Sequence, residues 1–313
     1  MNKRDRVMAA LHGETPDRIP AAFWFHFTGE RTFGQSAIDA HIDYFNQCGC
    51  DIMKIMSDHY FDYAASMEIH TPADWYRLKP LGTDHPFYAE QIVRAREIAK
   101  AVKKDALVYY TVFAPFSSIR SGYGDARVMQ MIKEDPDAVL HALDVITEDT
   151  QMFMKALFDA GVDGIYYSVQ GGEKSRFSVD EYRRLITPSD KAALDYANTL
   201  GDLNILHCCG WAGEQNNLEN WKDYRAAAVN WAVYVEKMGL REGRAFFENV
   251  RCILGGFDNT PDGILYRGTD EEVQAEIRRL CEMNGPSGYM IGADCSIPSD
   301  TSYDRIRMAV SYR

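Results

Sequence analysis

The sequence lacks any long apolar run, and it also lacks an excess of positive charge. No stretch of about 18 consecutive apolar residues occurs, so we expect no transmembrane helix and no membrane association. The 34 lysine and arginine residues are outnumbered by 46 aspartate and glutamate residues, which gives a net charge of −12. Nonspecific nucleic-acid binding requires clustered positive charge, so this class of function is excluded, although a local basic pocket is not.

A disulfide framework and a dithiol redox motif are missing as well. The seven cysteines are odd in number and scattered along the chain, and none of them forms a C-x-x-C motif. We therefore expect a cytoplasmic protein with reduced thiols. The apolar stretch at residues 7–11 is too short for a signal peptide, which favours the same location.

What the sequence does contain is eight short β-rich runs that alternate with helical patterns. The runs span residues 18–26, 50–57, 106–113, 161–169, 202–210, 227–234, 252–258 and 287–295. Residues 136–160 keep apolar side chains at helical spacing, and "SVDE" (178–181) and "TDEE" (269–272) are capping boxes that mark helix starts. The alternation predicts an α/β fold, a (β/α)₈ barrel formed by residues 1–313 as a single domain. An open doubly wound sheet is the alternative, but no G-x-G-x-x-G turn follows the first run.

Most of these runs end in a polar or metal-capable side chain, whereas their opposite ends show no such collection. The residues at or just after the ends are His26, Asp58, Gln170, His207, Cys209, Asp258, Asn259, Asp294 and Cys295. Active sites of (β/α)₈ barrels lie at the carboxyl ends of the strands, so this pattern predicts a site at that face. We expect the irregular, aromatic stretch of residues 58–86 to cover the mouth of the barrel.

The stretch "LHCCG" (206–210) predicts two reactive side chains on one face of a strand. His207 and Cys209 are two residues apart and point the same way in a β-strand, whereas Cys208 points to the other face. Cys295, after the eighth run, can reach the same centre over the mouth. One imidazole and two thiolates suit Zn²⁺ and leave a fourth tetrahedral position open, as in catalytic zinc sites. Ordinary core packing of the cysteines is the alternative.

The remaining residues at the strand ends suit catalysis or substrate contacts. Asp58 is a candidate general acid/base, partner of an imidazole or substrate contact, with helix capping as the alternative. Gln170 and Asn259 suit hydrogen bonds to a substrate. Asp258 is a candidate contact that could equally hold a loop, and His26 is either a substrate contact or a core histidine.

Residues 6–20, "RVMAALHGETPDRIP", follow the pattern R-V-x-x-A-L-x-G-x-x-P-D-R-x-P, and on this motif the chain resembles the uroporphyrinogen decarboxylase superfamily. Shorter landmarks then follow in the order of that family: "MSDHY", "VFAPFS", "GVDGIYYS", "LHCCG" and "GGFDN". The resemblance spans essentially the whole chain, and it implies a (β/α)₈ barrel.

Within this superfamily the chain is similar to the zinc-dependent, corrinoid-linked methyltransferases, such as the methylcobamide:coenzyme M methyltransferases. Their H-x-C motif and distant cysteine correspond to His207, Cys209 and Cys295, the last of these in "GADCSIP". The resemblance implies transfer of a methyl group between a corrinoid and a thiol or a methoxylated small molecule. Because the barrel takes up all eight βα units, we expect the corrinoid on a separate partner protein.

The decarboxylase branch of the superfamily implies a different activity. Its R-Q-A-G-R-Y signature is replaced here by "WFHFTGERTFG" (24–34), in which Arg31 is the nearby arginine. Asp58, however, matches the catalytic aspartate of that branch. A cofactor-free lyase that uses Asp58 is therefore the second hypothesis, and a non-catalytic barrel is the third.

Overall fold

The computed structural model describes residues 1–64 and 67–312, and its central element is a parallel sheet of seven strands. The strands are β1 (Ile52–Ile55), β2 (Leu107–Phe113), β3 (Gly164–Val169), β4 (Ile205–Cys208), β5 (Ala228–Trp231), β6 (Cys252–Phe257) and β7 (Tyr289–Ala293). They lie in the sheet in chain order, and every neighbouring pair is parallel. Each of the last seven predicted runs contains one strand, so the α/β class is confirmed.

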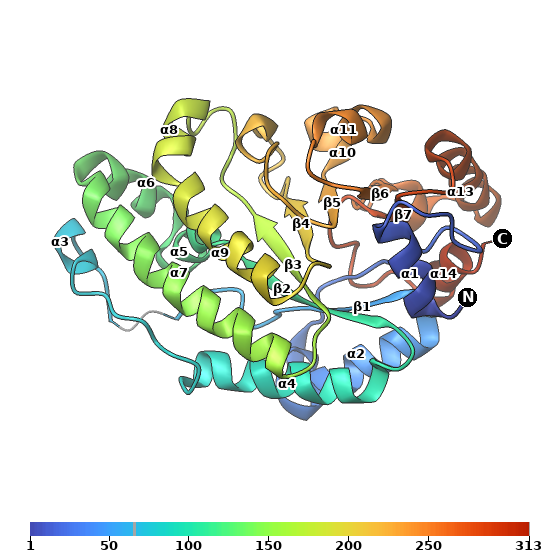
Figure 1. Cartoon of the computed structure of the whole chain (residues 1–313), viewed down its shortest axis with the longest axis horizontal. Helices are drawn as coiled ribbons and strands as arrows, with labels where there is room; N and C mark the ends of the chain where they lie inside the picture. Colours follow the sequence, from blue (N-terminus) through green and yellow to red (C-terminus); the bar gives the residue numbers. More distant parts are fainter. Residues whose placement is uncertain (65–66, 313) are drawn as a thin grey trace.

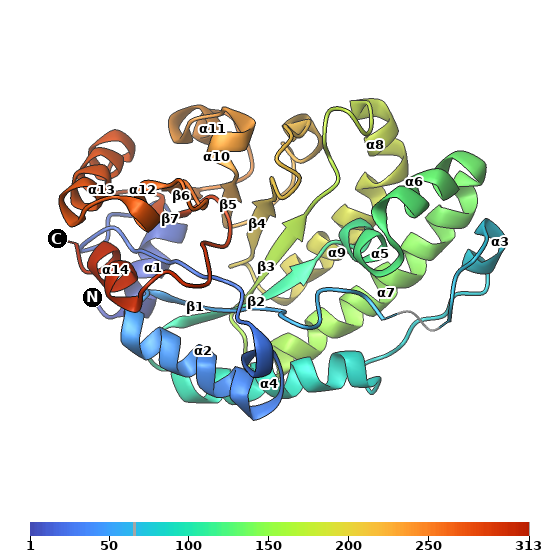
Figure 2. The same cartoon turned by 180° about the vertical axis from the view of Figure 1, so that it is seen from behind.

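Helices follow most strands and cover the outer side of the sheet (Figures 1 and 2). The helices are α1 (Lys3–Leu11), α2 (Gly34–Cys48), α3 (Pro72–Trp75), α4 (Pro86–Val102), α5 (Pro115–Tyr123), α6 (Asp125–Glu134), α7 (Pro136–Asp159), α8 (Val179–Leu185), α9 (Thr187–Leu200), α10 (Val233–Glu236), α11 (Leu240–Phe246), α12 (Ile264–Arg267), α13 (Asp270–Asn284) and α14 (Tyr303–Val310), with 3₁₀ turns η1 (Gly29–Thr32) and η2 (Leu218–Asn220). The predicted helix at 136–160 is confirmed by α7, and both predicted capping boxes start helices, α8 and α13. Within the described residues, no helix combines the length and apolar character needed to span a bilayer.

Alternation along the strands divides the buried side chains into two cores. The inner core contains residues near the strand starts, such as Ile52, Leu107 and Ile205, together with Val7 and Leu11 of α1. Helix α1 therefore closes the amino-terminal end of the space inside the curved sheet. The outer core lies between the other face of the strands and the surrounding helices. Burial on both faces explains why the strands are continuously apolar in sequence.

The expectation of eight strands is wrong for the first run, residues 18–26. This segment makes one isolated parallel bridge, between Ala21 and Ile291 of β7. Further along, its backbone groups bond outside a strand ladder: the Phe23 carbonyl accepts from the Tyr44 hydroxyl (2.6 Å), and the Trp24 carbonyl accepts from the amide of Ile297 (2.9 Å). Because these groups are already satisfied, the segment occupies the place beside β7 without becoming an eighth strand.

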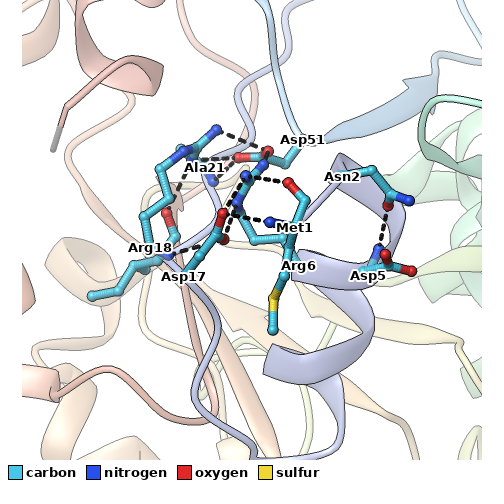
Figure 3. A network of polar contacts seen from close by, with 9 residues as sticks. Met1, Asn2, Asp5, Arg6, Asp17, Arg18, Ala21 and Asp51 are labelled. Carbon is cyan, nitrogen blue, oxygen red and sulfur yellow. Dashed lines mark hydrogen bonds and ion pairs between the residues drawn. The ribbon is translucent and has the colours of Figure 1, made fainter.

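A network of ion pairs anchors this first segment (Figure 3). The Asp51 carboxylate is fully buried, and it accepts hydrogen bonds from Arg6 (2.8 Å), from Arg18 (2.8 and 3.0 Å) and from the backbone amide of Ala21 (2.9 Å). Asp17 in turn accepts two hydrogen bonds from the Arg6 guanidinium (2.7 and 2.9 Å). The charged residues of the N-terminal sequence motif therefore join α1, the first segment and the start of β1.

We predict that Asp51→Ala strongly destabilises the protein. The substitution leaves two partly buried guanidinium groups and a buried amide without their acceptor, which typically costs about 3–5 kcal/mol. Equilibrium unfolding in urea measures the change. The matched control is Asp223→Ala, which removes an exposed ion pair with Lys191 (2.9 Å) and is expected to cost less than about 1 kcal/mol. Equal losses in the two variants would contradict the central role of Asp51.

His41 makes folding stability depend on pH. Its buried ring contacts the Ala37 carbonyl through Nδ1 (2.7 Å) and accepts at Nε2 from the amide of Met56 (3.0 Å), and burial lowers its pKa from the ordinary 6.5 to about 4. The unfolded chain therefore binds this proton at higher pH than the folded chain. The contribution of neutral His41 to the free energy of unfolding is fully present above pH 6.5. About 3 kcal/mol of it is lost as the pH falls from 6.5 to 4.

Unfolding in urea at several pH values between 4 and 7.5 tests this prediction. His41→Gln should remove that part of the pH dependence, because glutamine does not titrate. His12→Gln, at an exposed histidine, should keep it. An unchanged pH dependence in His41→Gln would contradict the assignment.

Candidate metal centre

The carboxyl ends of the strands enclose an inner cavity of about 120 Å³. Most of its lining residues lie two apart along a segment, because alternate residues of an extended chain point to the same face. They are Trp24, His26, Lys54, Met56, Thr111, Phe113, Tyr166, Ser168, Gln170, His207, Cys209, Trp211, Cys295 and Ser296. The residues singled out in the sequence that reach this cavity are His26, Gln170, His207, Cys209 and Cys295.

Three of these side chains form a compact group of potential metal ligands. Cys209 directly follows β4, which holds His207, and Cys295 comes two residues after β7. The Sγ atoms of Cys209 and Cys295 are 3.9 Å apart, and Cys295 Sγ is 3.5 Å from His207 Nε2. One ligand atom from each residue lies within 4.8 Å of the other two. Cys208 instead packs in the outer core, as its position in the strand predicts.

The two thiols differ in acidity because they share a hydrogen bond. This bond, together with the adjacent His207 imidazole, holds the pKa of Cys295 well below its usual range. The same bond and burial raise the pKa of Cys209. These shifts favour ionisation of Cys295 over that of Cys209, and a bound cation would stabilise the thiolate form of both. The donor set of one imidazole and two sulfur atoms fits Zn²⁺.

An aromatic ring holds the His207 imidazole in place. The rings of His207 and Tyr166 are stacked, with centroids 5.1 Å apart. The Tyr166 hydroxyl donates to Asn230 Oδ1 (2.6 Å), and Asn230 Nδ2 donates to the carbonyls of Leu254 (2.8 Å) and Ala293 (3.1 Å). The position of the imidazole is therefore set by β3, β5, β6 and β7. Its buried Nδ1 has no hydrogen-bond partner among the described residues.

Lys54 is a cavity residue that the sequence interpretation missed. Its ammonium is buried above the rings of Trp24 (4.8 Å) and Tyr166 (4.3 Å), and it lies 3.1 Å from Met56 Sδ. Burial lowers its pKa to about 7. A signal was present in the sequence, since Lys54 is a lysine inside the apolar strand run "CDIMKIMS". A charged residue at an inward position of a buried strand is rare, and it therefore marks a candidate site.

His26 and Asp58 form a pair at the edge of the cavity. His26 Nδ1 lies 2.6 Å from Asp58 Oδ1, and Asp58 Oδ2 accepts from the amide of Phe27 (2.9 Å). The Asp58 side chain is 3% exposed, whereas that of His26 is 51% exposed. The aspartate is thus a buried partner of an accessible imidazole, one of the three roles predicted for it. Helix capping is not among its contacts, because no helix begins next to it.

Of the other predicted site residues, Gln170 lines the inner cavity, whereas Asp258 and Asn259 do not. Gln170 lines the cavity and accepts from the Arg120 guanidinium (3.0 Å). Asp258 accepts from the amide of Thr260 (2.8 Å), and Asn259 donates to the carbonyl of Ser296 (3.2 Å), next to Cys295. These two residues hold loops and do not line the inner cavity. Their predicted substrate contacts stay predictions.

An outer cavity of about 370 Å³ adjoins the inner one. Its lining residues are His26, Phe61, Phe113, Arg120, Ser121, Asp125, Gln170 and Trp211. Four residues, His26, Phe113, Gln170 and Trp211, line both cavities, so the two share a boundary. Phe61 belongs to the irregular stretch 58–86, and this part of the stretch does border the mouth. Residues 65–66 of the stretch lie outside the described residues.

The fold and the cysteine–histidine cluster together define a parallel α/β protein with a candidate metal centre at its strand ends. Comparison with known families is more specific. A family model described as uroporphyrinogen decarboxylase (URO-D) matches residues 64–313. The chain therefore belongs to the uroporphyrinogen decarboxylase family. A search of curated proteins found no match.

Solved structures support the same fold. A methyltransferase from Methanosarcina mazei has a TM-score of 0.77 and 16% identity, over 99% of this chain and 98% of the other. A putative vitamin-B12 independent methionine synthase from Listeria monocytogenes has a TM-score of 0.55 and 13% identity, over 87% and 83% of the two chains. A B12-independent methionine synthase from Shewanella sp. W3-18-1 has a TM-score of 0.53 and 11% identity, over 94% and 95%. At these identities the likeness concerns the fold alone.

Proposed function

We propose that this protein is a zinc-dependent methyltransferase that moves a methyl group between a corrinoid and a thiol or a methoxylated small molecule. The observation that carries the proposal is the cluster of His207, Cys209 and Cys295, whose ligand atoms lie within 4.8 Å of one another at the strand ends. Membership of the uroporphyrinogen decarboxylase family and the likeness to a Methanosarcina mazei methyltransferase support it. The proposed unit is a single barrel domain in which residues 18–26 take the place of the eighth strand.

In this proposal His207, Cys209 and Cys295 hold Zn²⁺ and leave one coordination position for the substrate. Bound zinc would act as a Lewis acid that lowers the pKa of a thiol or polarises a methoxy oxygen. The chain contributes the fixed positions of the three ligands. The imidazole is held by Tyr166 stacking, and the Cys209 carbonyl accepts from Asn216 Nδ2 (3.3 Å).

His26 and Asp58 are proposed to handle the proton of the substrate. If Asp58 accepts from Nδ1–H, the lone pair of His26 Nε2 is left free, because the two ring nitrogens then have opposite roles. With a thiol substrate, the neutral ring would accept the thiol proton at Nε2. With a methoxylated substrate, the ring would have to be protonated beforehand, so that Nε2–H donates its proton to the departing alkoxide and the neutral ring is left. Asp58 acts in this scheme by positioning His26. Gln170 is proposed to bind substrate from the shared wall of the two cavities, with Asp258 and Asn259 as further predicted contacts.

The corrinoid is proposed to arrive on a separate protein that docks at the mouth. Several large apolar side chains are exposed on segments that follow the strand ends or the first extended segment: Phe33 (44%), Phe61 (45%), Trp211 (55%) and Tyr234 (51%). Exposed apolar residues gathered on one face are typical of an interaction surface. This face also holds the opening of the candidate site, so a docked partner would meet the substrate.

We predict that the protein purified without added metal carries about one equivalent of zinc, as a three-ligand catalytic site would. Cys295→Ala and Cys209→Ala should lose most of it, because two ligands cannot hold the ion as tightly. Cys208→Ala is the matched control, since Cys208 packs in the outer core and should not affect zinc content. Elemental analysis and zinc-edge anomalous scattering measure occupancy and position. Full zinc occupancy in Cys295→Ala would contradict the assignment of Cys295 as a zinc ligand.

We further predict that the zinc-loaded protein demethylates methylcobalamin in the presence of a thiol, or methylates cob(I)alamin from a methoxylated donor. His26→Asn should lower kcat by roughly 10²–10⁴-fold, the usual contribution of a general acid/base, while zinc content stays unchanged. His12→Asn, at an exposed histidine in α1's C-cap, is the control. The change in cobalamin absorbance gives the rate.

The same preparation separates the alternative activities. A cofactor-free lyase would release carbon dioxide from a carboxylated substrate without zinc and would depend on Asp58. A non-catalytic barrel would show neither metal nor turnover.

A further inference from the structure

The two cavities at the strand ends differ in chemical character. The inner cavity, about 120 Å³, contains the three candidate ligands and Lys54. The outer cavity, about 370 Å³, is bordered by the aromatic rings of Phe61, Phe113 and Trp211. Because the two cavities share four lining residues, a molecule whose reacting atom lies in the inner cavity would have room for its remaining body in the outer one.

Lys54 is a buried lysine without a carboxylate partner in the ion pairs of the described residues. Its ammonium contacts a thioether sulfur and two aromatic faces, which are weak partners for a charge removed from water. The nearby Asp58 carboxylate is already bonded to His26 and to the amide of Phe27. A buried ammonium in this environment is stabilised by an anion that enters the cavity.

The other cation at the cavities has a carboxylate partner, which it shares with Arg176 (2.6 Å). Arg120 is 3% exposed and donates to Asp125 (2.9 Å) and Gln170 (3.0 Å). Its guanidinium also lies over the Trp211 ring, 4.9 Å from the centroid, which holds the ring at the mouth. Of the two basic side chains that line the cavities, Lys54 is thus the one without a carboxylate partner among the described residues.

The candidate metal ligands do not remove this imbalance. Two thiolates and a neutral imidazole carry two negative charges, which a divalent cation cancels. Once the centre is loaded, an anion that enters the cavity would stabilise the charged form of Lys54 against the neutral amine that burial favours. That anion is either a negatively charged group of the substrate or the negative oxygen that forms when a methyl group leaves.

We propose that the substrate site takes a small aromatic anion, with its carboxylate or phenolate oxygen paired to Lys54 and its ring between Phe61, Phe113 and Trp211. This inference rests on the proposed function, because it places the reacting atom beside the candidate metal centre. It narrows the substrate class from any thiol or methoxylated molecule to an aromatic ring that carries negative charge. Lys54 is the specificity residue for the charge, and the outer cavity selects the ring.

Isothermal titration calorimetry of the zinc-loaded full-length protein with three probes tests the proposal. Benzoate has both the charge and the ring, benzamide keeps the ring without the charge, and acetate keeps the charge without the ring. Benzoate should bind about 10- to 100-fold more tightly than benzamide, as expected for a charge-assisted hydrogen bond. It should also bind about 10-fold more tightly than acetate, through stacking and apolar burial.

Substitutions test whether Lys54 causes the preference for a charged ligand and whether Trp211 contributes to the preference for an aromatic ring. Lys54→Met should bind benzoate only as well as benzamide, whereas Lys54→Arg should keep the preference. Lys174→Met, at an exposed lysine that donates to Gln215 (3.1 Å), is the matched control and should behave as wild type. Trp211→Ala should weaken benzoate and benzamide by about fivefold each and leave acetate unchanged.

The wild-type comparison alone can overturn the proposal, so it does not depend on the folding of any variant. Equal affinities for benzoate and benzamide would remove the role of charge, and equal affinities for benzoate and acetate would remove the role of the ring. A preference for benzoate that survives in Lys54→Met would reject Lys54 as its source. The zinc content of the same sample reports separately on the proposed function. A wrong metal assignment can therefore be distinguished from a wrong substrate class.

Discussion

The buried carboxylate of Asp51 is the point on which the closure of the fold depends. It binds two arginines from the N-terminal motif and the amide of Ala21, and its own amide donates to the Ala21 carbonyl (2.9 Å). On the other side, the same segment exchanges hydrogen bonds with Ile291 of β7 (2.8 and 2.9 Å). The first segment therefore connects the two ends of the seven-stranded sheet. Trp24 and His26, which lie further along it, reach the candidate site because this connection holds.

The candidate site follows from the alternation of side chains along the strands. Inward positions near the strand starts fill the inner core, and the next inward positions towards the carboxyl ends line the cavities. Tyr166 belongs to both levels, because it packs in the inner core and also stacks on His207 and lies under Lys54. A substitution that changes the packing of the inner core would therefore shift the positions of the candidate ligands. The stability of the inner core is therefore linked to the geometry of the candidate ligands at the strand ends.

Much of this could be predicted from the sequence, and the parts that could not have physical reasons. The period of two in "LHCCG" separates Cys209 from Cys208, and the structure places them on opposite faces of the sheet. The run at 18–26 has the composition of a strand, but its backbone partners are side chains and loops whose positions depend on the whole fold. Asp258 and Asn259 lie at a strand end as expected, yet their side chains bond to the chain itself. Lys54 was visible as a charge in an apolar run, but its lack of a carboxylate partner is a property of the folded state.

The three candidate ligands come from distant parts of the chain, since Cys295 is separated from Cys209 by 86 positions. During synthesis on the ribosome, His207 and Cys209 emerge long before the strand that precedes Cys295. A nascent chain that ends before β7 would present two ligands and no third, and its first segment would lack the strand to which it is bridged. If the proposed zinc site forms, capture of the ion would follow the formation of β7 and come late in folding. In a cell, bound metal would then distinguish fully folded chains from chains in which β7 has not yet formed.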